Sequence, residues 1–85
     1  MDGEMSRNLE VGKWNKLPHY AVIGNPQDFY VWVNEDKFGS NSGWIKGAKA
    51  FEAYNKLANL HKKDRVGFVT MVKALYKTYA KAGSY

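Results

Sequence analysis

The sequence of 85 residues has no cysteine, only two prolines and no long hydrophobic run. Without cysteine, a disulfide-stapled scaffold and a thiolate zinc site are both excluded. The longest apolar run, Phe29 to Val33, is far too short to span a bilayer. The first seven residues are polar and acidic, where an export signal would be basic and then apolar. We therefore expect a cytoplasmic protein.

The chain is also too short for a Rossmann fold, a TIM barrel or a kinase, and it has room for one modest core. Aromatic residues make up 15% of the sequence. We expect these rings to supply the stability that disulfides or metals supply in other small domains.

The two halves of the chain carry opposite charge. Residues 1–45 contain four lysines and arginines against six carboxylates, which gives 4 − 6 = −2. Residues 46–85 contain nine against two, which gives 9 − 2 = +7. A field of this sign attracts polyanions, although it does not choose between nucleic acid, an acidic protein and a membrane surface.

The first half of the chain favours β-structure. Residues 1–10 have few apolar positions and are expected to form a flexible arm, so the folded domain is predicted over 11–85. Two runs of β-branched and aromatic residues flank Gly24-Asn25-Pro26 and predict a hairpin over about 19–33. Alternation along the second run places Tyr30 and Trp32 on the face opposite Phe29, Val31 and Val33. We expect Tyr30 and Trp32 to stay outside, beside Tyr20 or its neighbours.

Residues 34–43 are polar and rich in glycine and serine, so we interpret them as a flexible loop. Trp44-Ile45 fits either a short third strand or a plug for the core.

The second half of the chain has the spacing of two helices, over about 48–61 and 64–82. The first has an apolar stripe of Phe51, Tyr54, Leu57, Ala58 and His61. The second is predicted to start after Asp64 as N-cap and to stop at Gly83. Its first part, 65–72, is rich in β-branched residues and also fits a strand, but the apolar spacing continues without a phase break to Tyr79. These elements predict a small single α+β domain, in which a β-hairpin or three-stranded antiparallel sheet packs on two C-terminal helices.

Catalytic constellations are scarce in this sequence, and we expect no enzyme activity, cofactor or metal site. His19 and His61 are the only imidazoles; they would suit an acid-base pair for RNA cleavage, although ordinary structural roles explain both. Glu35 and Asp36 match no calcium loop. The glycines of Gly43 to Gly47 suggest anion capture at a helix N-terminus, but they lack Walker spacing, and a simple turn into the helix explains them better.

Surplus aromatic residues beside a lysine-rich half favour a nucleic-acid-binding protein, with RNA or single-stranded nucleic acid preferred. Tyr30 and Trp32, together with Tyr20, would stack on bases. The expected backbone contacts are Lys56, Lys62, Lys63, Arg65, Lys73, Lys77 and Lys81. Because the chain has only two arginines, recognition is expected to have low sequence specificity.

Other interpretations remain open. The chain also fits a small protein-binding inhibitor or adaptor, such as a virus-encoded accessory protein that acts on a host nucleic-acid enzyme, with exposed aromatics as the hot spot and an acidic protein as partner. Binding at a membrane surface is less favoured, because the apolar helix stripes are needed to close the core. A homo-oligomer formed through a free sheet edge is also compatible with the sequence.

Overall fold

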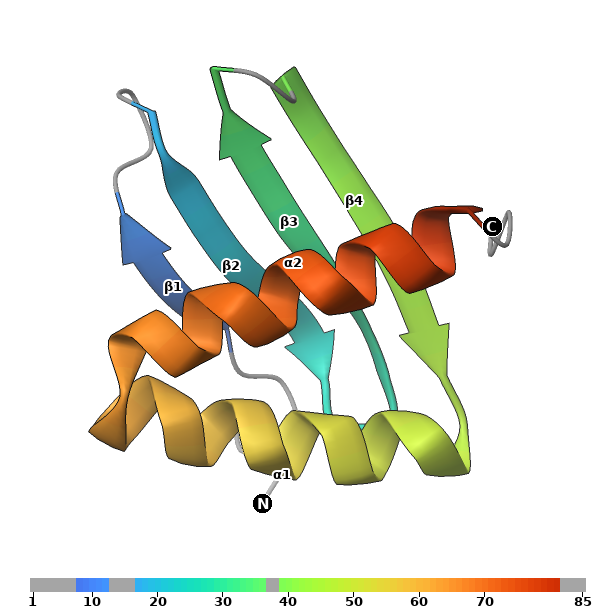
Figure 1. Cartoon of the computed structure of the whole chain (residues 1–85). Helices are drawn as coiled ribbons and strands as arrows, with labels where there is room; N and C mark the ends of the chain where they lie inside the picture. Colours follow the sequence, from blue (N-terminus) through green and yellow to red (C-terminus); the bar gives the residue numbers. More distant parts are fainter. Residues whose placement is uncertain (1–7, 13–16, 37–38, 82–85) are drawn as a thin grey trace.

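A computed structural model describes residues 8–12, 17–36 and 39–81 of the chain. Four strands come first and two helices follow (Figure 1). The strands are β1 (Leu9–Gly12), β2 (His19–Asn25), β3 (Asp28–Glu35) and β4 (Gly39–Lys46), and the helices are α1 (Ala48–Lys63) and α2 (Arg65–Lys81). This architecture confirms the predicted small α+β domain.

The strands form one antiparallel sheet in the order β1-β2-β3-β4. Pro26 and Gln27 form the turn between β2 and β3, so that Asn25 pairs with Asp28. Each strand pairs with its sequence neighbour, which leaves β1 and β4 as the two sheet edges.

Both helices lie against one face of the sheet, and the core fills the space between them (Figure 1). Phe29, Val31 and Val33 are fully buried, whereas Tyr30 and Trp32 between them are only half-buried, as the alternation predicted. Helix α1 contacts the sheet through Tyr54, whose ring packs edge-on against Phe29 with centroids 5.4 Å apart and planes at 73°. The other buried residues of this core are Tyr20, Val22, Ile45, Ala50, Leu57, Phe68 and Val72.

Two expectations about the first half of the chain are wrong. Leu9 and Glu10 belong to β1 and pair with Val22 and Ala21, so the part of the expected arm that the structure describes is a strand. The expected loop over 34–43 instead contains the end of β3 and most of β4, since the ladder continues to the pair Glu35 and Gly39. Backbone pairing with β3 holds this polar segment in the sheet. The residue types of the segment do not indicate a strand.

The two helices are confirmed, with changes at their ends. Helix α1 runs to Lys63 instead of 61, and residues 65–72 are helical and not a strand. The Gly67 N–H donates to Asp64 Oδ1 at 3.0 Å, which confirms Asp64 as the N-terminal cap of α2. Phe51 is 47% exposed, contrary to the expected stripe, and Ala50 is buried in its place. Gly83 lies outside the described residues.

Within the described residues, no helix is long and apolar enough to cross a membrane.

Candidate nucleic-acid interface

A line of three exposed lysines runs along α1. Lys49, Lys56 and Lys63 are seven residues apart and therefore lie on one side of the helix. Seven residues of α-helix span about 10.5 Å, close to the Debye length of about 10 Å at 0.1 M salt. Their fields overlap at that ionic strength, and none of the three is in a salt bridge within the described part of the chain.

A shallow groove between the helices contains two of these lysines. It has a volume of about 290 Å³ and is lined by Lys49, Glu52, Ala53, Lys56 and Met71. Glu52 is the only carboxylate within α1, and it lies between Lys49 and Lys56 along the helix. The groove therefore contains two positive charges and one negative charge.

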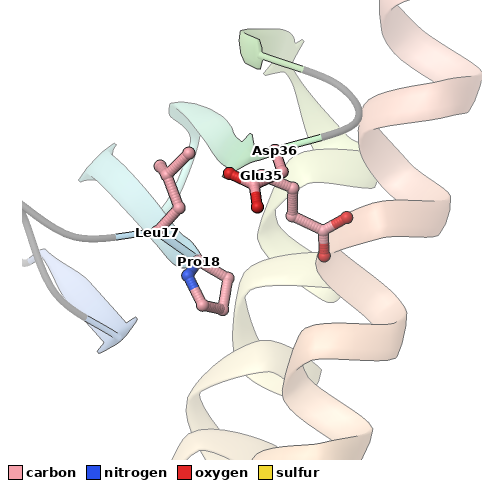
Figure 2. Close-up of a pocket in the computed structure, with 4 residues that line it drawn as sticks. All are labelled: Leu17, Pro18, Glu35 and Asp36. Carbon is pink, nitrogen blue, oxygen red and sulfur yellow. The ribbon is translucent and has the colours of Figure 1, made fainter.

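Lys73 of α2 has its charge compensated by the acidic half of the chain. Its Nζ lies 3.2 Å from Glu35 Oε2, and 5.9 Å from the centre of the Tyr20 ring. Figure 2 shows the Glu35 side chain pointing from the end of β3 toward α2, beside a depression lined by Leu17, Pro18, Glu35 and Asp36. Lys73 is therefore less available to a polyanion than the α1 lysines.

The remaining predicted cations differ in position. Lys77 is exposed one turn beyond Lys73, whereas the Lys81 side chain lies outside what the structure describes. Lys62 and Lys63 are both exposed, but adjacent helical residues point about 100° apart, so only Lys63 continues the α1 line. The Arg65 Nε donates to the His61 carbonyl at 3.1 Å, which places this guanidinium at the turn between the helices.

The predicted stacking residues lie on the sheet face away from the helices. Tyr30 and Trp44 are cross-strand partners whose ring centroids are 5.1 Å apart at 62°, and the Trp44 Nε1 donates to Asp28 Oδ1 at 2.7 Å. Trp32 alternates with the buried residues of β3 and shares this face. We call Tyr30, Trp32 and Trp44 the aromatic face. The expectation that Tyr20 joins them is wrong, because Tyr20 pairs with Val33 and is buried on the helix side.

The structure thus separates two groups that the sequence analysis combined. It brings Lys56 and Lys63 together on the helical layer, with Arg65 and Lys77 also exposed on its helices, and it places Tyr30 and Trp32 on the opposite side of the sheet. Lys49 was not among the expected contacts, although the seven-residue spacing of Lys49, Lys56 and Lys63 is visible in the sequence. We call the exposed cations of the two helices the basic surface: Lys49, Lys56, Lys62, Lys63, Arg65 and Lys77.

The histidines occupy separate places in the fold. His61 packs edge-on against Phe68 at 5.1 Å, and its Nε2 donates to the Glu10 carbonyl at 3.0 Å, so it ties α1 to β1. His19 is fully buried at the start of β2. No group of three or more acidic or histidine side chains among the described residues has an arrangement that could hold a metal ion.

Gly47 connects β4 to α1 with φ of 89°, and its N–H donates to the Gln27 carbonyl at 3.1 Å. This supports its interpretation as a turn into the helix.

Comparisons of the chain with protein-family models, curated proteins and solved structures gave no match.

Proposed function

We propose that this protein is a non-enzymatic binder of nucleic acid that holds the phosphate backbone on its basic surface. The observation that carries the proposal is the α1 line of Lys49, Lys56 and Lys63, exposed and without a salt bridge in the described part of the chain. Lysine is a compact point charge that suits phosphate, and phosphate contacts carry no sequence information, so binding through the backbone depends little on sequence.

The charge of the helical segment supports the same proposal. From Ala48 to Lys81 the sequence has eight lysines and arginines against Glu52 and Asp64, which gives 8 − 2 = +6. Asp64 is occupied in capping α2. Within the described residues, no carboxylate forms a salt bridge with a lysine of the α1 line.

Base stacking on Tyr30 and Trp32 is not part of this proposal, because the aromatic face lies on the other side of the sheet. The affinity is therefore expected to come from counterion release and to be similar for sequences of equal length and charge.

The test is a titration of a labelled 20-nucleotide single-stranded RNA, with a DNA duplex in parallel, at rising salt. Engagement of about five cations predicts a slope of log K against log salt near −4. Tyr30→Ser is expected to leave both affinity and slope unchanged. Absence of binding at low salt would end the proposal.

A second candidate, a protein-binding adaptor, is favoured by the aromatic face. Aromatic rings that are only half-buried are typical of interface hot spots, and Tyr30, Trp32 and Trp44 form such a group on one side of the sheet. Binding of a purified protein partner that survives nuclease treatment and is lost in Tyr30→Ser would favour this candidate.

A further inference from the structure

The outer edge of the sheet at β4 presents backbone groups that β3 does not use. In an antiparallel ladder, successive residues direct their N–H and C=O alternately toward one neighbour and toward the other. The bond from the Gly47 N–H to the Gln27 carbonyl extends the β3–β4 register and fixes its phase. The residues whose backbone N–H and C=O groups point away from β3 are therefore Ser40, Ser42, Trp44 and Lys46.

No described segment pairs with the outward backbone groups of this edge, while α2 crosses over β4 on the helix side of the sheet (Figure 1). No hydrogen bond among the described residues reaches the outward groups of β4, and the strand is eight residues long without proline. Natural edge strands are usually protected by charge, proline, a bulge or a covering segment. Here the only charge is Lys46 at one end.

The opposite edge is protected. β1 has only four residues, and the outward Glu10 carbonyl is occupied by His61 Nε2 at 3.0 Å. Figure 1 shows β1 and β4 at opposite edges of the sheet, so the described part of the chain offers a single free edge.

We propose that two copies of this chain pair through β4 to form a continuous eight-stranded sheet with two-fold symmetry. One antiparallel register uses every outward group: Ser42 of one copy faces Trp44 of the other, and Ser40 faces Lys46. The symmetry axis then passes between the two Gly43 residues. This register forms about eight interchain hydrogen bonds, two for each of the four facing pairs.

Side chains support the same register. Each Lys46 faces a neutral serine and not the second Lys46, so the only charge on the strand meets no like charge directly opposite. The two Trp44 residues become diagonal neighbours on the aromatic face, at a separation of about 7–8 Å that large rings can bridge. A two-fold contact between identical edges closes on itself, so the assembly stops at the dimer.

The experiment measures the oligomeric state of the full chain by sedimentation, after nuclease treatment and at about 0.5 M salt to remove bound nucleic acid. Ser42→Pro is the main variant, because the Ser42 N–H points outward and proline is tolerated where an edge strand faces solvent. Ser42→Ala is the matched control, since it removes the hydroxyl and keeps the backbone donor.

The wild type and Ser42→Ala are expected to dimerise with the same dissociation constant, and Ser42→Pro to raise that constant about tenfold or more. A wild type that stays monomeric up to about 1 mM would overturn the proposal, and so would a Ser42→Pro protein that dimerises normally. Open-ended filaments would overturn the assignment of a single free edge.

Amide hydrogen exchange on the wild type decides the case if Ser42→Pro fails to fold. The Ser42 and Trp44 amides are expected to become protected as protein concentration rises, whereas the Gly43 and Ile45 amides, which face β3, stay protected throughout. Unchanged exchange at Ser42 and Trp44 would contradict the dimer.

Discussion

Removal of the α1 lysine line tests the proposed function most directly. The triple variant Lys49→Gln, Lys56→Gln, Lys63→Gln keeps helix propensity nearly constant, because lysine and glutamine are similar helix formers. If each lysine neutralises one phosphate, the salt slope falls by about 0.7 to 0.9 per residue, or about 2 to 3 in total. At 0.1 M salt the same relation lowers the affinity about 100-fold or more. Fluorescence anisotropy with labelled RNA measures both quantities.

Two further variants distinguish a loss of binding that comes from lost positive charge from one that comes from misfolding. Lys73→Gln removes the same formal charge but leaves the basic surface intact, because Lys73 is held by Glu35 at 3.2 Å; it should change the slope by much less than one unit per charge. Glu52→Gln should tighten binding about twofold, since a carboxylate about 10 Å from a phosphate costs about 0.4 kcal/mol in water. An unchanged slope in the triple variant, or equal losses for Lys73→Gln and any one of the three lysines, would refute the assignment.

The remaining predictions concern stability and are measured by urea unfolding with circular dichroism. Asp64→Ala should cost about 1 kcal/mol through loss of the α2 cap, whereas Asp64→Asn should keep most of it. Phe68→Ala should cost about 3–5 kcal/mol, because the ring is fully buried, while Phe51→Ala, at a site that is 47% exposed, should change stability by about 0.5 kcal/mol or less. Gly24→Ala should cost more than Gly47→Ala: both have positive φ, but a Cβ at Gly24 would lie 2.6 Å from a backbone carbonyl oxygen, and one at Gly47 meets nothing within 4 Å. Equal losses at the two glycines would contradict the steric argument.

Periodicity in the sequence predicted those elements whose side chains face the core. The alternation along β3 separated Phe29, Val31 and Val33 from Tyr30 and Trp32, and the apolar spacing after Asp64 identified α2 despite its β-branched residues. When one face of an element is buried, its apolar residues recur at the period of the strand or helix, and this recurrence is visible in the sequence. The signal failed at Phe51, where a position of the right period lies at the rim of the helix and stays exposed.

Elements held by backbone pairing left no such pattern. The ladder from Asn34 and Ser40 to Glu35 and Gly39 needs only N–H and C=O groups, which every residue there supplies. Its side chains have the composition of a loop, so the sequence favoured a loop. β1 was missed for a related reason, since four residues are too few to establish an alternation.

For the candidate interface, the sequence supplied the residue types but not their arrangement in space. The sequence located the cations in the second half of the chain, yet the contact between Lys73 and Glu35 joins residues 38 positions apart and depends on how α2 crosses the end of β3. Packing of both helices on one side of the sheet also left the aromatic face on the other side. Residue type thus indicated which groups were available, and tertiary packing decided which of them share a surface.

The two proposals concern different surfaces and respond to salt in opposite directions. In a continuous antiparallel sheet, directly facing residues project to the same side, so a β4 dimer places both helical layers on one side of the sheet. Two strongly cationic layers then approach each other, and added salt favours the dimer by screening their repulsion. The same salt weakens binding of nucleic acid by reducing the gain from counterion release. A polyanion lying across both helical layers would also offset their repulsion. At low salt, binding of nucleic acid and dimerisation therefore favour each other. At high salt, the dimer is held by the β4 edge alone.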